Sequence, residues 1–221
     1  MPAGDIQDII RNRIAAAPDR MLSFAAVMEL ALYHPGHGYY GRGPVRIGRR
    51  GDFYTAVSVG PLYGRLLAEL AARIWHRLGA PDEFTIIEQG AHDGQLMEDV
   101  ARGLESIGSP LAEKACFLIV EPNENYRAAQ AAKLAPMLGS RIAWRCAVEG
   151  LLKEPGQAFF ITNELLDAFP VHRIRWDGRA WGEQMVTLGN DGASLVWRDA
   201  PIADPRVDAE ASRLPVDLPP G

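Results

Sequence analysis

A short turn with two glycines is the first place where the sequence suggests chemistry. Residues 88–94 read E-Q-G-A-H-D-G and follow an apolar run at residues 84–87. Gly90 and Gly94 allow a tight turn and let the backbone approach a ligand closely, while the carboxylate of Glu88 can accept hydrogen bonds from a polar ligand group. The turn is therefore a candidate site for a small polar molecule, although two glycines after a strand also suit an ordinary structural turn.

A second acidic residue, Glu121, directly follows the next apolar run, residues 116–120. In a parallel sheet an acid at this place lies across the crevice and can hold both ribose hydroxyls, as in NAD enzymes and in S-adenosylmethionine (SAM) dependent methyltransferases. Against NAD, residues 90–94 lack the Gly-x-Gly-x-x-Gly pattern that cradles a pyrophosphate. The sequence thus favours SAM over NAD, and capping of the following helix is the structural alternative for Glu121.

Residues 47–56 are a second candidate region, ahead of a long predicted helix. We expect this stretch to form a lid over the cofactor, with glycines such as Gly51 in the loop, Asp52 or Thr55 bonding the cofactor and Phe53 packing on it. A solvated connecting loop is the alternative, because glycine and arginine need no function in such a loop.

Residues 163–171 are the third candidate, directly after an apolar run at residues 158–162. The carboxyl ends of parallel strands line the ligand crevice, so Asn163 and Glu164 are expected where cofactor and substrate meet. Asp167 would share the face of Glu164 if this turn is helical. Two carboxylates beside a methyl donor suit a guanidinium, which they can hold bidentately. We therefore predict that Glu164 and Asp167 are catalytic and that Asn163 binds the cofactor; a helix N-cap is the alternative.

Alternating strands and helices must position these residues. Such alternation requires parallel strands and right-handed crossovers, hence a doubly wound, Rossmann-like α/β sheet. Strands are expected at residues 84–88, 116–120, 141–146 and 158–162, with helices at 96–104 and 123–134. Asp177-Gly178 predicts a C-terminal antiparallel hairpin of residues 171–176 and 181–187, beside which residues 195–197 pair.

Helices precede this core. Apolar periodicity predicts helices at residues 6–14 and 24–32 and a long amphipathic helix at 61–78. The apolar face of the long helix comprises Leu62, Leu66, Leu70, Ile74 and Leu78. We expect an N-terminal helical and lid region at residues 1–80, a SAM-binding core at 81–200 and a proline-rich tail at 201–221 that lies on the surface or frays.

Composition limits the class of protein. The 221 residues are 48% hydrophobic and 23% charged with a net charge of −5, which is typical of a globular domain and gives no attraction to nucleic acid. No apolar run reaches the ~20 residues of a membrane span, and the N-terminus lacks a secretory pattern. Cys116 and Cys146 lie in apolar runs without CxxC spacing, so we expect buried reduced thiols, a cytoplasmic location and no metal site.

Read in order, four motifs resemble the MidA-like methyltransferase family, which includes the mitochondrial complex I assembly methyltransferase. They are A-L-Y-H-P with G-Y-Y at residues 31–40, I-G with G-D-F and T-A at 47–56, E-x-G at 88–90, and N-E-L-L-D-A-F-P-V at 163–171. The resemblance implies a class I methyltransferase fold, SAM as methyl donor and, for the mitochondrial members, arginine in a protein as acceptor. We expect methyl transfer by in-line displacement, driven mainly by proximity and orientation.

Departures from the family pattern bear on activity. His92 stands where the family has the middle glycine of its turn, Gln95 replaces a threonine, and Val57-Ser58 replace Pro-Glu. The bulk of His92 is expected to crowd the methionine part of SAM. The family chain also continues with further strands and helices, so a truncated or shortened chain is expected. The alternative function is a binding or assembly module of the same fold without catalysis.

Overall fold

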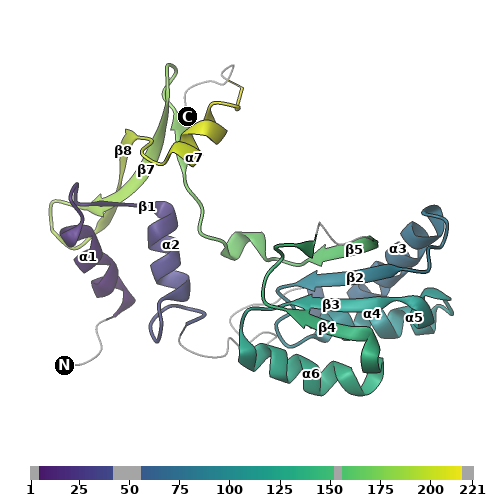
Figure 1. Cartoon of the computed structure of the whole chain (residues 1–221). Helices are drawn as coiled ribbons and strands as arrows, with labels where there is room; N and C mark the ends of the chain where they lie inside the picture. The colour runs from purple at the N-terminus through teal and green to yellow at the C-terminus, as the bar shows by residue number, and fades with distance from the viewer. Residues whose placement is uncertain (1–4, 42–55, 152–155, 216–221) are drawn as a thin grey trace. The chain divides into compact units, whose positions relative to one another are not determined.

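The computed structural model describes residues 5–41, 56–151 and 156–215, whose helices and strands are drawn in Figure 1. Contacts divide the chain into two compact units. Unit 1 contains residues 1–45 and 168–221, and unit 2 contains residues 46–167. This division differs from the expected one, because the N-terminal helices and the C-terminal strands fall in the same unit.

Unit 2 is built on a parallel sheet with the strand order β4-β3-β2-β5. Its strands are β2 (Phe84–Gln89), β3 (Cys116–Val120), β4 (Ile142–Arg145) and β5 (Gln157–Thr162). The register places Glu88 between Ile119 of β3 and Ile161 of β5. The predicted strands and their parallel arrangement are confirmed. Parallel pairing brings the carboxyl ends of all four strands to one edge of the sheet.

Helices and short 3-10 turns precede, connect and follow these strands. They are η1 (Ala56–Val59), α3 (Leu62–Arg77), α4 (Gln95–Ser106), α5 (Leu111–Lys114), α6 (Glu124–Leu138), η2 (Gly139–Arg141) and η4 (Leu166–Ala168). One core joins alternate residues of the strands, such as Phe84, Ile86 and Ile119, to Met97 and Leu104 of α4. Full burial of side chains of this size contributes about 1.5–3 kcal/mol each. Glu88 follows Phe84 and Ile86 at the same alternation, so its side chain lies on the α4 side of the sheet.

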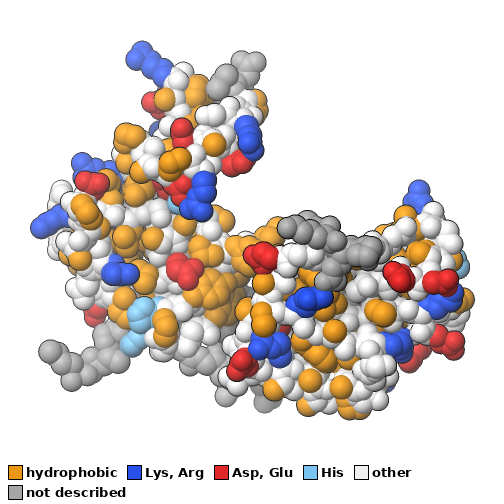
Figure 2. All heavy atoms as spheres, in the orientation of Figure 1, with side chains coloured by type: hydrophobic (Ala, Val, Ile, Leu, Met, Phe, Trp, Pro, Cys, Tyr) orange, Lys and Arg blue, Asp and Glu red, His pale blue; other side chains and the backbone are white. Residues whose placement is uncertain are grey.

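Helix α3 packs with a face other than the one that its leucines predict. Leu62, Leu66 and Leu70 are 67%, 59% and 46% exposed. The buried residues are Gly64, Ala68, Ala71, Ala72 and Trp75. The glycine and the alanines among them allow α3 to lie close to α4, since a Cβ added at Gly103 of α4 would lie 2.8 Å from the Cβ of Ala68. The predicted apolar face is therefore wrong, and hydrophobic side chains are also visible on the surface of both units in Figure 2.

Unit 1 combines two helices with an antiparallel sheet. Its elements are α1 (Ile6–Ala16), β1 (Met21–Ser23), α2 (Phe24–Tyr33), β6 (Ile174–Trp176), β7 (Trp181–Leu188), β8 (Leu195–Pro201) and α7 (Pro205–Ala211). Strand β7 pairs with β1, β6 and β8, and Trp176 lies opposite Trp181, so the predicted hairpin is confirmed. The segment expected to be a surface tail contains α7, which is capped by Asp204.

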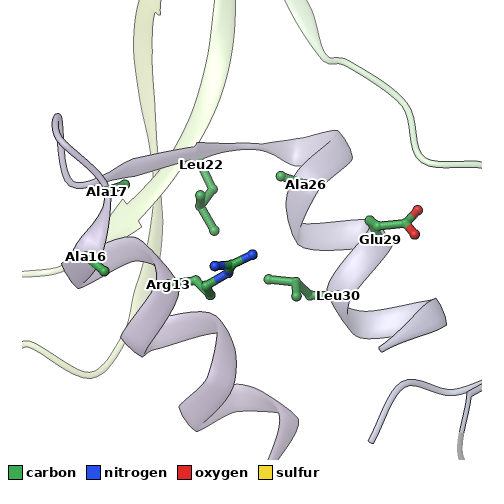
Figure 3. A pocket seen from close by; sticks show the side chains of 7 residues that line it. All are labelled: Arg13, Ala16, Ala17, Leu22, Ala26, Glu29 and Leu30. Atoms are coloured by element: carbon green, nitrogen blue, oxygen red, sulfur yellow. The ribbon is translucent and has the colours of Figure 1, made fainter. Parts of the chain in front are cut away.

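A pocket of about 340 Å³ lies in unit 1, between α1, β1 and α2 (Figure 3). It is lined by Arg13, Ala16, Ala17, Leu22, Ala26, Glu29 and Leu30. Arg13 and Glu29 are its charged groups, and the remaining side chains are aliphatic. The residues predicted to bind a cofactor do not line it.

Both cysteines are free and exposed, so their predicted burial is wrong. Cys116 is the first residue of β3, and Cys146 directly follows the last residue of β4, so both lie at strand ends. Over residues 5–41, 56–151 and 156–215, no helix is both long and apolar enough to cross a membrane.

Candidate functional site

The glycine turn begins where β2 ends and closes at the start of α4. Three of its residues have left-handed backbones, with φ of 78° at Gly90, 48° at His92 and 80° at Gly94, which is the N-cap of α4. A Cβ at Gly90 would lie 2.8 Å from Cδ1 of Leu165, the residue after Glu164. Gly90 is therefore favoured by its φ, and a side chain at this position would require Leu165 to move.

Glu88 is buried beside this turn and is only 3% exposed. Its Oε2 atom has no hydrogen-bond partner among the described residues. Burial raises the pKa of Glu88 to about 8, the nearby charge of Asp93 adds to the rise, and the backbone N–H of Met97 opposes it. A buried acceptor without a partner is rare in folded proteins, and it marks Glu88 as a group suited to a ligand.

Glu121 follows β3 and is 7% exposed. Its Oε1 accepts the backbone N–H of Asn123 at 2.9 Å, and Asn123 itself caps α6 through the N–H groups of Asn125 and Tyr126. Burial raises the pKa of Glu121, while the N–H of Asn123 and the charge of Arg127 lower it. The helix cap is thus Asn123, and Glu121 orients that cap while its carboxyl group stays at the carboxyl edge of the sheet.

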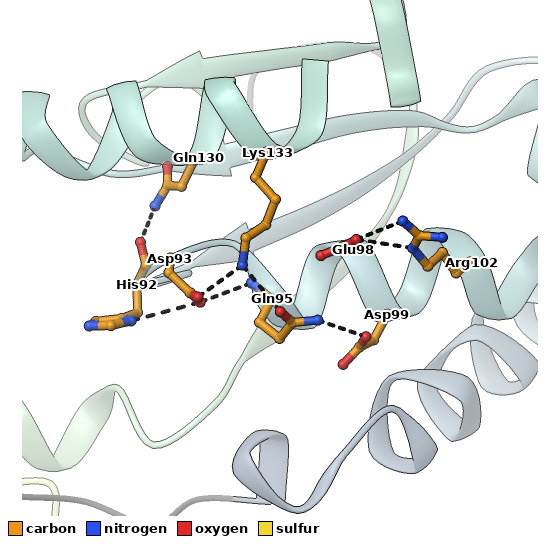
Figure 4. Close-up of polar contacts among 8 residues, drawn as sticks. All are labelled: His92, Asp93, Gln95, Glu98, Asp99, Arg102, Gln130 and Lys133. Carbon is orange, nitrogen blue, oxygen red and sulfur yellow. Dashed lines mark hydrogen bonds and ion pairs between the residues drawn. The ribbon is translucent and has the colours of Figure 1, made fainter. Parts of the chain in front are cut away.

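A polar network fastens the turn to α4 and α6 (Figure 4). Lys133 of α6 donates to Asp93 Oδ2 at 2.9 Å and to Gln95 Oε1 at 3.2 Å. Gln130 donates to the backbone O of His92 at 2.8 Å and accepts from Trp144 at 3.0 Å. This network could not be predicted from the sequence, because Asp93 and Lys133 are 40 residues apart.

His92 lies against α6. Its ring centroid is 5.1 Å from that of Tyr126, and its Nδ1 is 3.8 Å from Asp93 Oδ1, an ion-pair distance rather than a hydrogen bond. Interaction with His92, and then with Lys133, holds the pKa of Asp93 well below its usual range. His92 and Tyr126 thus form an aromatic pair beside this turn. That the His92 side chain crowds the methionine part of SAM stays a prediction.

The third candidate lies at the same edge of the sheet as the turn. Thr162, the last residue of β5, pairs with Gln89, so Asn163 and Glu164 follow directly beside Gly90. Glu164 has a φ of 49° and Asp167 belongs to a 3-10 turn, so the two are not on one face of an α-helix as the sequence suggested. Both side chains are exposed, and Asn163 is half-buried.

The remaining predicted residues, Gly51, Asp52, Phe53 and Thr55, lie outside the described residues. Among the residues that the structure does describe, histidine, cysteine, aspartate and glutamate form no group of three that could hold a metal ion.

Comparison with known proteins identifies relatives. Residues 66–221 match the model of a family of S-adenosyl-L-methionine-dependent methyltransferases. The mouse (Mus musculus) mitochondrial protein arginine methyltransferase NDUFAF7 is 26% identical over 207 residues, which cover 83% of this chain and 46% of that protein. The Drosophila melanogaster homologue is 26% identical over 187 residues, which cover 76% and 42%. This chain thus spans about half the length of these relatives.

A solved structure matches most of the chain. It is a COG1565 superfamily member from Burkholderia thailandensis, determined with bound S-adenosylhomocysteine. The match has a TM-score of 0.72 and 30% sequence identity, and it covers 94% of this chain and 52% of the other.

Proposed function

The chain belongs to the SAM-dependent methyltransferase family, and on that premise we propose that it binds SAM at the carboxyl edge of the parallel sheet and transfers the methyl group to an arginine side chain of a protein. The observation that carries this proposal is the buried carboxyl group of Glu88, which lacks a partner for Oε2 in the described chain and lies beside the turn of residues 90–94. The family match and the solved relative with S-adenosylhomocysteine support the same cofactor.

The residues present fit SAM. Glu88 offers a carboxyl group for the ammonium of its amino-acid part, and Gly90 and Gly94 leave two positions of the turn without a side chain. Glu121, which directly follows the neighbouring strand β3, would accept hydrogen bonds from the ribose hydroxyls. When bound, SAM supplies an electron-poor methyl group on its sulfonium sulfur.

The protein's part in the reaction is to hold and orient. Glu88, Gly90 and Glu121 would hold the cofactor by its two polar ends and so orient it for the reaction. Glu164 follows β5, next to Gly90, and its exposed carboxylate can hold the guanidinium of an incoming arginine and turn one nitrogen toward the methyl group. Catalysis then comes from proximity and alignment for in-line displacement. Arginine as acceptor is supported by the names of the mitochondrial relatives.

Two measurements test this function. Calorimetry with SAM, S-adenosylhomocysteine and NAD should show binding of the two adenosylated ligands and not of NAD. Mass spectrometry of a cell extract incubated with labelled SAM and this protein should then find label on arginine residues. Label on another residue type would refute arginine as the methyl acceptor but would still support methyl transfer as the activity.

The alternative is a module that binds SAM without transferring the methyl group. It is favoured by the arrangement of the two predicted catalytic acids, since Glu164 and Asp167 do not share a helical face. The same extract experiment distinguishes the two functions, because such a module binds SAM with normal affinity and labels no protein.

A further inference from the structure

The buried carboxyl group of Glu88 has a consequence for how a ligand enters the site. A carboxylate inside the protein is costly unless a cation or several donors compensate for the lost water. Glu88 is 3% exposed, and its Oε2 has no partner among the described residues. Burial raises the pKa of Glu88 to about 8, so the group holds a proton at neutral pH.

Among the residues that the structure describes, no cation pairs with the carboxyl group of Glu88. Asp93 is a second acid, and its charge raises the pKa of Glu88 further. Lys133 is already bound to Asp93 and Gln95. The other titratable groups on neighbouring elements, within the described residues, are His92 in the turn, Glu98, Asp99, Arg102 and Glu105 on α4, Glu124, Tyr126 and Arg127 on α6, Glu121 after β3, and Glu164 and Asp167 after β5. Of the cations in that set, Arg102 is bonded to Glu98, and Arg127 is bonded to the backbone oxygens of Glu121 and Pro122.

We propose that Glu88 releases a proton to solvent when the ammonium group of the cofactor arrives, so that cofactor binding is coupled to proton release. This inference rests on the proposed function. The O–H bond of the carboxylic acid breaks, the electron pair stays on the carboxylate, the proton goes to water, and the carboxylate pairs with the ammonium group. No bond forms between protein and cofactor.

The size of the effect follows from the protonated fraction. A group with a pKa of about 8 is roughly 90% protonated at pH 7, so binding should release roughly 0.9 proton there. Between pH 6 and 7 the affinity should rise about tenfold, because the ionised form that the ligand needs becomes about ten times more populated.

Calorimetry on the whole chain at pH 7, in two buffers of different ionisation enthalpy, measures the released protons. Two probes separate the parts of the ligand. S-adenosylhomocysteine carries the ammonium group, whereas 5′-methylthioadenosine has the same nucleoside without the amino-acid part. We expect roughly 0.9 proton released with the first probe and close to none with the second.

Two variants assign the proton to its residue. Glu88→Gln should abolish the proton release with S-adenosylhomocysteine and flatten the tenfold change in affinity between pH 6 and 7. Asp99→Asn is the matched control. Asp99, on α4, is also a buried acid, and burial raises its pKa as well, so this variant should keep both the proton release and the pH dependence of the affinity. If Glu88→Gln does not fold, carbon NMR of the glutamate-labelled parent should show the Glu88 carboxyl group ionising near pH 8 without ligand and at much lower pH with it.

The outcomes separate this inference from the function beneath it. Binding of S-adenosylhomocysteine without proton release, equal release with both probes, or unchanged release in Glu88→Gln each overturns the inference while leaving cofactor binding in place. A chain that binds neither probe at any pH refutes the proposed function, and the inference with it.

Discussion

Leu165 occupies the space into which a side chain at Gly90 would extend, since a Cβ there would come within 2.8 Å of Leu165 Cδ1. Gly90 follows β2 and Leu165 follows β5, so this contact joins the glycine turn to the segment that carries Glu164. Gly90 and Leu165 are 75 residues apart in the sequence. The two candidate regions that contain them therefore pack against each other at a point where Gly90 has no side chain.

Gly90→Ala should consequently destabilise the protein by more than the backbone cost of an alanine at positive φ, which is about 1–2 kcal/mol. Gly79→Ala is the matched control, because Gly79 also has a positive φ of 87° but nothing lies within 4 Å of its added Cβ. Urea denaturation of both variants gives the difference. Equal losses of unfolding free energy in the two variants would show that Leu165 moves aside without destabilising the fold. Adding Leu165→Ala to Gly90→Ala should restore part of the lost unfolding free energy.

Glu121→Ala should weaken binding of SAM by more than ~1.5 kcal/mol, because charge-assisted hydrogen bonds to the ribose would be lost. Glu124→Ala is the control: this acid lies on the next helix and is 90% exposed. Isothermal titration with S-adenosylhomocysteine measures both. A folded Glu121→Ala variant with the affinity of the parent removes Glu121 from the cofactor site.

The raised pKa of Glu88 also predicts how the stability of the ligand-free chain depends on pH. The unfolded chain loses this proton near the ordinary value of 4.5, whereas the folded chain keeps it up to about pH 8. The folded state thus binds more protons in this window, so the free energy of unfolding should fall as the pH rises from 4.5 to 8. Urea titrations at several pH values should show this fall in the parent and a flatter profile in Glu88→Gln. A parent whose stability rises over the whole window contradicts the prediction.

Helix α3 predicts opposite responses on its two faces. Leu66→Gln should change the free energy of unfolding by less than about 0.5 kcal/mol, because Leu66 is 59% exposed. Ala68→Leu should cost about 1–3 kcal/mol, since Ala68 is fully buried against Gly103 of α4. Thermal or urea denaturation compares the two. A large loss in Leu66→Gln, with none in Ala68→Leu, would mean that α3 packs by its leucines.

Glu164→Gln should lower methyl transfer while leaving the affinity for SAM nearly unchanged, because the amide keeps the shape of the side chain but loses the charge that holds a guanidinium. Single-turnover transfer to a protein substrate and calorimetry measure the two quantities. Asp167→Asn tests the second acid, and Glu105→Gln, an exposed acid near the end of α4, is the control. If Glu164→Gln transfers the methyl group as fast as the parent, under conditions where the chemical step limits the rate, the catalytic role of Glu164 is refuted.

The parallel sheet could be predicted because its signals are local. Apolar runs such as residues 84–87 and 116–120 alternate with helical periodicity, and Asp177-Gly178 specifies a turn within a few residues. Glu88 and Glu121 were found in the same way, since each is the polar residue at the end of such a run.

What the sequence could not reveal depends on contacts between distant residues. The leucines of α3 have ideal helical spacing, but Gly64, Ala68 and Gly103 permit a closer approach to α4 than leucine would. The left-handed backbone of Glu164 could not be predicted, because glutamate seldom adopts this conformation. The prediction that Glu164 and Asp167 share one face of a helix is therefore wrong. The ion pair of Asp93 with Lys133 requires α4 and α6 to be placed first.

The small-residue contact between α3 and α4 has a consequence for the entropy of the site. Glycine and alanine have no rotamers to lose, so Gly64, Ala68, Ala71 and Gly103 join the two helices without restricting side-chain motion. Long side chains at the same place would each have to give up rotameric freedom on folding. Gly103 lies near the C-terminal end of α4, so this contact helps to fix the helix whose N-cap is Gly94, and its glycine and alanine residues add no side-chain entropy cost of their own.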